Sequence, residues 1–265
     1  KFEINKNYPN YEIVHSVIKN FFVDEKKFSK LPNNLNHKKF AVEFNFFVFP
    51  KFFLENLKKV FARHNVVIKK FIFSSYSKSL FYLDKISDKK KKIFVDIGFE
   101  KTCAFLFENK KMEQYKILPI GGNHITKDIS KILKIEISKA DEIKLNFNNI
   151  DTNKSLKKYQ IELVKKVIFA RIEEILEIST LFFKTNDDLK NIKLVFFGNG
   201  SKILDSKFKS SIIFNYDIDL LDENYIDICL SGLDLINSEK ETLVNKFDFQ
   251  NKKKGFFEKF FNLFG

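Results

Sequence analysis

The sequence predicts a mixed α/β fold, and three stretches of the chain support that prediction. The stretch that begins at Ile93 reads as two strands joined by a turn, because apolar runs flank Asp96-Ile97-Gly98. Residues 192–197 form a mostly apolar run of strand length. Residues 159–183 instead repeat apolar side chains near the 3.6-residue period of a helix. Strands combined with a long helix favour an α/β domain.

The first third of the chain predicts further strands and helices. Its apolar residues alternate with polar ones in some segments and follow a helical period in others. Pro50 marks a helix start, since proline is well tolerated at the first turn. Strands are predicted over residues 11–23, 39–49 and 66–73, and helices over residues 51–64 and 74–83.

A glycine pair follows the predicted hairpin. A third strand, residues 115–120, leads into Gly121-Gly122, and a helix follows with Thr126 or Asp128 near its start. Glycines let backbone N–H groups approach an anion, and a carboxylate beside them can hold a metal ion next to phosphates. The Asp96 turn taken alone is equally compatible with an ordinary hairpin.

Composition narrows the function classes. The chain has 265 residues, of which 44% are hydrophobic, so it can bury the core of one large or two modest domains. No apolar run approaches the roughly 18 residues that span a bilayer. The net charge is +13, but the lysines are spread along the whole chain, so we do not predict nucleic-acid binding. Cys103 and Cys229 are expected to be buried free thiols, because no CxxC or Cys/His cluster accompanies them.

The run from Leu118 to Ile129, LPIGGNHITKDI, together with the Asp96 turn, resembles the second phosphate loop of the actin-like ATPases. That superfamily includes actin, MreB and the DnaK-type chaperones. Within it, the run is most similar to the FtsA family, the membrane tethers of bacterial cell division. His15 to Asp24 resembles the start of that family's inserted subdomain, and Gly198-Asn199-Gly200-Ser201 resembles its adenosine motif.

The resemblance implies a partial actin-like ATPase fold with an FtsA-type inserted subdomain and a C-terminal amphipathic helix. The family's first phosphate loop would precede Lys1, so we expect weak ATP affinity and at most a weak ATPase. The resemblance implies that the inserted subdomain covers residues 1–70 and that a remnant of the first actin-like half covers residues 71–92. The second half would cover residues 93–236, with an inserted helical part at about 130–188. A linker over residues 237–251 and the terminal helix over residues 252–265 would follow.

The resemblance also implies a site for ATP and Mg²⁺. Asp96 would lie near the metal and the phosphates, and the glycines would supply backbone contacts. The residues implied to line the site are Asp96, Gly98, Thr102, Gly121, Gly122, Asn123, Glu142, Lys144, Gly198, Asn199 and Gly200.

Two departures from the family pattern indicate a degraded catalytic site. Phe99-Glu100-Lys101 stands where the family has small residues, and Asn199 stands where it has a glycine. Two alternatives stay open elsewhere. Glu142 and Lys144 could be solvated charges at a helix end, and Arg171 could pair with neighbouring glutamates rather than reach a nucleotide.

The tail from Lys252 to Phe264 has the pattern of an amphipathic helix. Its apolar residues fall on one broad helical face, and lysines precede them. The alternative is a helix that packs on the protein's own core. The residues predicted to bind membrane are Lys253, Lys254, Phe256, Phe257, Phe260, Phe261, Leu263 and Phe264.

These expectations describe a cell-division protein that tethers an FtsZ ring to the membrane. It would lie peripherally on the cytoplasmic face of the bacterial inner membrane. Its expected partners are FtsZ, further copies of itself, membrane lipids and other division proteins, with no nucleic acid. Two alternatives share the fold: a PilM-like adaptor of pilus assembly, and an ATP-dependent enzyme such as a sugar kinase.

Overall fold

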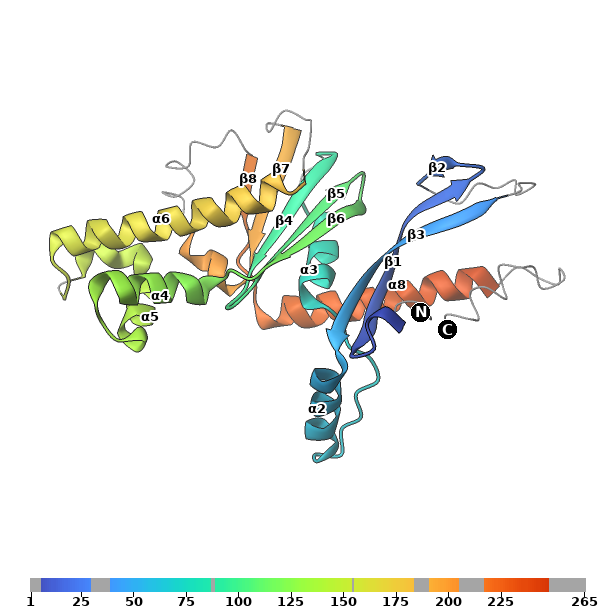
Figure 1. The fold of residues 1–265 in the computed structure, drawn as a ribbon, viewed down its shortest axis with the longest axis horizontal. Helices are drawn as coiled ribbons and strands as arrows, with labels where there is room; N and C mark the ends of the chain where they lie inside the picture. The colour runs from blue at the N-terminus through green and yellow to red at the C-terminus, as the bar shows by residue number, and fades with distance from the viewer. Residues whose placement is uncertain are drawn as a thin grey trace. The chain divides into compact units, whose positions relative to one another are not determined.

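The chain divides into two compact units in a computed structural model. The structure describes residues 6–29, 39–86, 89–153, 155–183, 191–204 and 217–247. The first unit comprises Lys1–Ser77 and Leu230–Gly265, and the second comprises Lys78–Cys229. Each unit contains one β-sheet (Figure 1). The boundaries fall within two helices, α3 (Ser74–Leu83) and α8 (Tyr225–Phe247).

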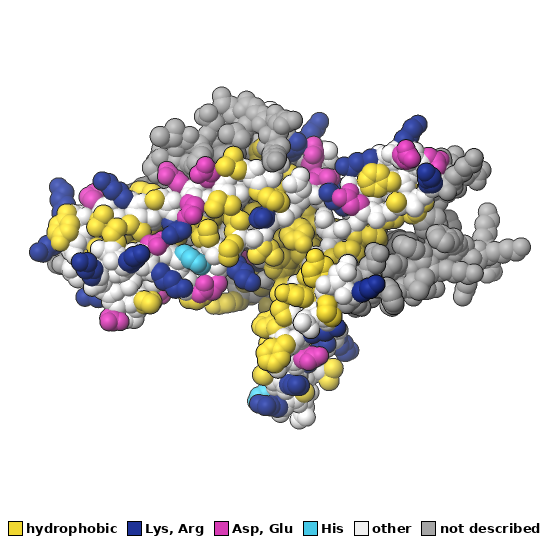
Figure 2. Space-filling model, in the orientation of Figure 1, with side chains coloured by type: hydrophobic (Ala, Val, Ile, Leu, Met, Phe, Trp, Pro, Cys, Tyr) yellow, Lys and Arg dark blue, Asp and Glu magenta, His cyan; other side chains and the backbone are white. Residues whose placement is uncertain are grey.

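The first unit contains a three-stranded antiparallel sheet in the order β2-β1-β3. Many of its strand positions are only half-buried. The helix that follows β3 leaves several aromatic side chains in solvent, and Phe52 is 75% exposed. Figure 2 shows these hydrophobic side chains among basic ones on α2. The elements are β1 (Tyr11–Val23), β2 (Lys26–Phe28), β3 (Phe40–Pro50) and α2 (Lys51–Ala62).

The predicted strand over residues 66–73 is wrong. These residues have no strand partner in the described part of the chain, although the helices predicted on either side of them are present. The end of the segment is fixed by a side chain instead, because the Phe73 N–H donates to Nε2 of His15 at 2.9 Å. The Phe73 ring also packs against Phe47, with 5.4 Å between ring centres. Aromatic packing, rather than hydrogen bonding to a neighbouring strand, therefore holds this segment.

The second unit contains a five-stranded sheet in the order β6-β5-β4-β7-β8. The predicted hairpin at Asp96 is confirmed, since Asp96 lies opposite Cys103 on antiparallel strands. β7 is parallel to β4, and β8 is parallel to β7. The three central strands are almost wholly buried, as their apolar runs predict. The strands are β4 (Lys91–Ile97), β5 (Thr102–Glu108), β6 (Lys111–Leu118), β7 (Ile192–Phe197) and β8 (Asp217–Leu220).

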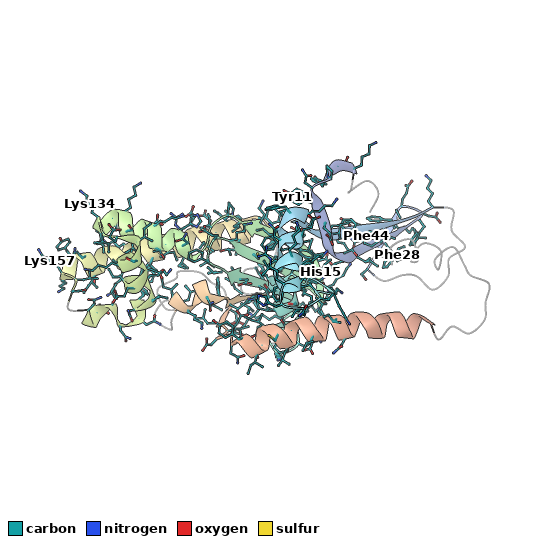
Figure 3. The ribbon with its side chains drawn as sticks, turned by 90° about the horizontal axis from the view of Figure 1, so that it is seen from below. Tyr11, His15, Phe28, Phe44, Lys134 and Lys157 are labelled. Atoms are coloured by element: carbon teal, nitrogen blue, oxygen red, sulfur yellow. The ribbon has the colours of Figure 1, made fainter. Side chains whose placement is uncertain are left out.

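Helices pack together beside this sheet within the second unit (Figure 1). The apolar stripe predicted for the long helix is buried at Ile161, Val164, Ile168, Ile172 and Ile175, in one core with strands β4, β5 and β7. Figure 3 shows Lys134, which follows α4, and Lys157, which precedes α6, at the outer end of this helical layer. The helices are α4 (Gly122–Leu133), α5 (Ile137–Leu145) and α6 (Lys158–Leu181), with 3₁₀ turns η1 (Phe147–Thr152) and η3 (Asn199–Ile203).

The carboxyl-terminal region differs from the prediction in two respects. α8 continues to Phe247, so residues 237–247 of the expected linker are helical. Beyond Gly232 the helix meets no further glycine or proline before Phe247, and Glu, Lys and Leu there favour helix. Cys229 is exposed rather than buried, whereas Cys103 is buried as expected.

No helix within the described ranges is long and apolar enough to span a bilayer. The predicted membrane-binding tail, residues 252–265, lies outside those ranges.

Candidate functional site

The glycine turns predicted to bind a nucleotide converge at one end of the second unit's sheet. Asp96 and Phe197 are register partners on parallel strands, so the turns that follow both strands lie side by side. Gly198 has a φ of +89°. A Cβ atom there would overlap Oδ1 of Asp96. A Cβ atom on Gly200 would lie 2.7 Å from the Ile97 carbonyl oxygen. The glycines are therefore required by close packing between the two turns.

The hairpin turn also packs on the first turn of α4. The Gly122 N–H donates to the Gly98 carbonyl at 2.9 Å, and the Asn123 N–H donates to the Phe99 carbonyl at 2.8 Å. A Cβ atom on Gly121 would lie 2.6 Å from the Phe99 carbonyl oxygen. Amides at a helix N-terminus can bind an anion when they are free. The Gly122 and Asn123 amides already donate to carbonyl groups of the protein itself.

Side chains around the hairpin form two further links. The Thr102 hydroxyl donates to the Ile120 carbonyl at 2.7 Å, which joins β5 to the segment before α4. The Asn123 side-chain amide donates to Oε1 of Glu100 at 2.6 Å. Asn199, in contrast, is exposed at the start of η3. The structure thus brings Thr102 and Asn123 to the turns and leaves Asn199 at the surface.

A buried cluster of charges lies at the end of β4, and we call Lys78, Asp96 and Glu223 the ion triad. Nζ of Lys78 lies 2.9 Å from Oδ2 of Asp96 and 3.1 Å from Oε2 of Glu223. The Gly198 N–H also donates to Oε2 of Glu223, at 3.0 Å. Burial raises the pKa of Glu223, and the Lys78 ammonium opposes that rise.

Sequence reasoning missed two members of the ion triad. Lys78 is the only charged residue in the segment 74–83, which was predicted as a helix. A single charge in an otherwise uncharged helix was the available signal for a buried, paired lysine. Glu223 carried no comparable signal, because other acidic residues, Asp219 and Asp222, stand close to it in the sequence.

A second polar cluster joins α4 to α5. Nζ of Lys144 lies 2.6 Å from the Thr126 hydroxyl oxygen and 2.6 Å from Oδ1 of Asp141. Lys144 also approaches the Gly122 carbonyl, at 3.4 Å. The hydrogen bond from Lys144 lowers the pKa of Asp141. Lys144 therefore lies beside the glycine turns, whereas Glu142 is exposed on α5.

The residues at Asp96 do not fit the implied Mg²⁺ ion. Magnesium requires near-octahedral oxygen ligands at about 2.0–2.1 Å and retains several waters. The Asp96 side chain is only 9% exposed and is already paired with an ammonium. Within the part of the chain that the structure describes, no group of three or more His, Cys, Asp or Glu residues could hold a metal ion.

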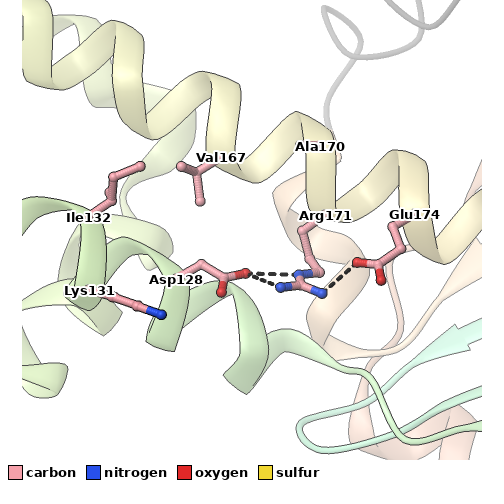
Figure 4. A pocket seen from close by; sticks show the side chains of 7 residues that line it. All are labelled: Asp128, Lys131, Ile132, Val167, Ala170, Arg171 and Glu174. Carbon is pink, nitrogen blue, oxygen red and sulfur yellow. Dashed lines mark hydrogen bonds and ion pairs between the residues drawn. The ribbon is translucent and has the colours of Figure 1, made fainter.

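A groove of about 580 Å³ lies between α4 and α6 (Figure 4). Arg171 of α6 forms ion pairs across and along it, with Asp128 at 2.7 Å and with Glu174 on its own helix. The pair with Glu174 is the predicted local alternative, whereas the pair with Asp128 on α4 was not predicted. The lining residues, none of which was predicted to bind nucleotide, are Asp128, Lys131, Ile132, Val167, Ala170, Arg171 and Glu174.

Solved structures define the fold. The chain aligns with a chain of a PilM–PilN type IV pilus biogenesis complex at a TM-score of 0.58 and 12% identity, covering 83% of this chain and 60% of that one. It aligns with MreB5 of Spiroplasma citri bound to ADP at a TM-score of 0.56 and 14% identity, covering 74% and 68%. This likeness shows an actin-like fold.

Sequence comparison finds similarity to one family of proteins. Residues 93–198 match the family model "Cell division protein FtsA". The chain is 25% identical over 183 residues to FtsA of Streptococcus pneumoniae, covering 64% of this chain and 40% of that protein. It is 27% identical over 187 residues to FtsA of Bacillus subtilis, covering 64% and 42%. The chain is similar to the FtsA family over these residues, and its matches span about two fifths of the length of these relatives.

Proposed function

We propose that this chain is an FtsA-type adaptor that links an FtsZ ring to the cytoplasmic face of the inner membrane. The observation that carries the proposal is the family match over residues 93–198. The sequence of the tail, with its apolar helical face after a run of lysines, supplies a means of attachment. The proposed partners are FtsZ, further copies of the chain, anionic lipids and other division proteins.

The tail has the strength expected of a reversible anchor. Full burial of one phenylalanine contributes about 1.5–3 kcal/mol, and insertion at an interface realises only part of that. A lysine near an anionic leaflet adds about 1 kcal/mol. Ordering a short helix offsets some of this gain. One tail should therefore bind modestly, and several tails on one polymer should bind far more tightly through their effective concentration.

Nucleotide turnover is not required for this role. A tether needs a membrane anchor and a partner surface, and neither depends on hydrolysis. The pairing of Asp96 with Lys78 and the internal hydrogen bonds of the Gly122 and Asn123 amides both reduce what is available to a phosphate. We therefore propose weak ATP binding at most, without Mg²⁺ held by Asp96.

Co-sedimentation of the full chain with anionic vesicles and FtsZ tests the tether. The double variant Phe257→Asp/Phe261→Asp places two charges on the apolar face, and vesicle binding should fall at least about tenfold. Asn262→Asp adds a charge to the polar face and should change binding far less. FtsZ should reach the vesicles only with a binding-competent chain. Equal binding by all three proteins, or vesicles that never recruit FtsZ, would argue against the tether.

A PilM-like pilus adaptor is the second candidate, because a chain of the PilM–PilN complex has a similar fold. At 12% identity that likeness supports the fold alone. The two candidates differ in their partner. A chain that leaves FtsZ in solution at every lipid composition, and instead retains a pilus-assembly peptide, would replace the first proposal with the second.

A further inference from the structure

A buried lysine occupies the position next to Asp96 where the family resemblance implies a metal ion. The side chains of Lys78, Asp96 and Glu223 are only 6%, 9% and 6% exposed. Nζ of Lys78 also lies 4.7 Å from the centre of the Phe197 ring, on its face. The ammonium is thus largely removed from water and is surrounded by two carboxylates and an aromatic ring.

The three charges of the triad do not cancel. Two carboxylates against one ammonium leave a formal charge of −1, and the Gly198 N–H offsets it only in part. Oε1 of Glu223 is buried and has no hydrogen-bond partner among the residues that the structure describes. A buried carboxylate pair of this kind must take up a proton or be paired with a cation, because leaving it uncompensated is strongly destabilising. Lys78 supplies that cation.

We propose that Lys78 is a built-in cation that takes the place of a divalent metal ion at this end of the sheet. Its ammonium links parts of the second unit through two ion pairs. One is with Asp96 at the end of β4, and the other is with Glu223, which precedes α8 and accepts from the Gly198 N–H of the turn after β7. Because the cation is part of the chain, this arrangement persists without metal or nucleotide. The inference concerns this site and does not depend on membrane tethering.

The proposal makes a gain-of-function prediction. Lys78→Ala removes the ammonium and opens space beside Asp96 and Glu223. The two carboxylates then offer oxygen ligands of the kind that Mn²⁺ and Mg²⁺ prefer. The variant should therefore acquire a divalent-cation site that the wild-type chain lacks. The matched control is the triple variant Lys78→Ala/Asp96→Asn/Glu223→Gln, which has the same space but no carboxylate.

Mn²⁺ binding to the full chain, followed by electron paramagnetic resonance alongside thermal unfolding, tests this prediction. Lys78→Ala should melt at a lower temperature than wild type and should bind Mn²⁺ at least about tenfold more tightly than either wild type or the triple variant. Added Mn²⁺ should recover its melting temperature. The triple variant should melt higher than Lys78→Ala without metal and should not respond to Mn²⁺.

Two results would overturn the built-in cation. One is a folded Lys78→Ala variant that binds Mn²⁺ no better than the triple variant. The other is a wild-type chain that binds Mn²⁺ through Asp96, seen as binding that Asp96→Asn abolishes. If Lys78→Ala does not fold, the comparison of wild type with Asp96→Asn tests the proposal. Mn²⁺ binding to the wild-type chain that Asp96→Asn leaves unchanged supports it.

Discussion

The end of β4 and the start of α4 are two parts of the same predicted phosphate site. Their polar groups are bound by different partners within the protein. At the end of β4, a lysine from α3 neutralises Asp96 through side-chain charge. At the start of α4, backbone carbonyls of the hairpin turn accept from Gly122 and Asn123. One part is closed by an ion pair and the other by main-chain hydrogen bonds. Glycine-rich turns with the sequence of a phosphate loop can therefore be explained by packing alone.

The largest expected effect tests the packing of the turn after β7. Gly198→Ala introduces a Cβ atom that overlaps Oδ1 of Asp96, at a φ of +89°. The backbone cost is about 1–3 kcal/mol and overpacking costs about 1–3 kcal/mol. We expect the free energy of unfolding to fall by about 2–6 kcal/mol, as measured by urea denaturation.

Gly232→Ala is the matched control for that substitution. A Cβ atom on Gly232 meets only Cδ1 of Ile72, at an ordinary 3.6 Å, within helix α8. Alanine in a helix interior is more stable than glycine by about 0.5–1 kcal/mol, so this variant should gain stability. A similar loss in both variants would contradict the assignment of Gly198 to a packed turn.

A smaller effect is expected at the start of α4. The Gly121 backbone is extended, with φ of −153°, so alanine there adopts the conformation without strain. Its Cβ atom would still lie 2.6 Å from the Phe99 carbonyl oxygen. We expect Gly121→Ala to cost about 1–3 kcal/mol. Hydrogen exchange at the Gly122 and Asn123 amides should accelerate, and unchanged exchange would contradict the closure of this turn by main-chain hydrogen bonds.

A contribution of about 1 kcal/mol is expected from the Thr126 hydroxyl. It donates to Oδ1 of Asp141 at 2.9 Å and accepts from Lys144 at 2.6 Å. Thr126→Val keeps the shape and removes these bonds together with the 3.3 Å hydrogen bond to the Gly122 carbonyl of the same helix, so the melting temperature should fall. Thr180→Val is the control, because the Thr180 hydroxyl donates only within its own helix, to Leu176 at 2.8 Å and to Glu177. A larger loss at Thr180 would show that the α4–α5 link contributes little.

The smallest effect is a pH dependence at Asp141. Hydrogen bonding from Lys144 lowers the pKa of Asp141 below its ordinary value of 3.8. The folded state therefore gains stability from the ionised carboxylate above that value and loses it as pH falls through the lowered pKa. Asp141→Asn should remove this acid-dependent part of the melting curve. Glu142→Gln, on the exposed neighbour, should leave it unchanged, and equal curves for both variants would contradict the role of Asp141.

The features that depend on local sequence pattern could be predicted from the sequence. The hairpin at Asp96, the buried strand over residues 192–197 and the apolar stripe of α6 all follow from periodicity and turn residues, and all are present. The convergence of the Asp96 and Gly198 turns required only that their strands be parallel neighbours.

The remainder depends on contacts between distant parts of the chain. Lys78 and Glu223 lie on opposite sides of Asp96 in the sequence, and no local pattern pairs them. Residues 66–73 have strand-like composition, but their end is fixed by His15 and by aromatic packing rather than by a neighbouring strand. A propensity scale describes what a segment prefers, and tertiary packing decides between those preferences.

The division of the chain has a consequence for the order in which it folds. The first unit needs both the segment that ends at Ser77 and the segment that starts at Leu230, and a hydrogen bond of 3.2 Å joins Ser77 to Ser231 within it. A ribosome makes the first of these segments before the second unit and the other segment after it. The second unit, which is continuous, can complete its sheet in the interval. The first unit is therefore begun before the second unit and completed after it.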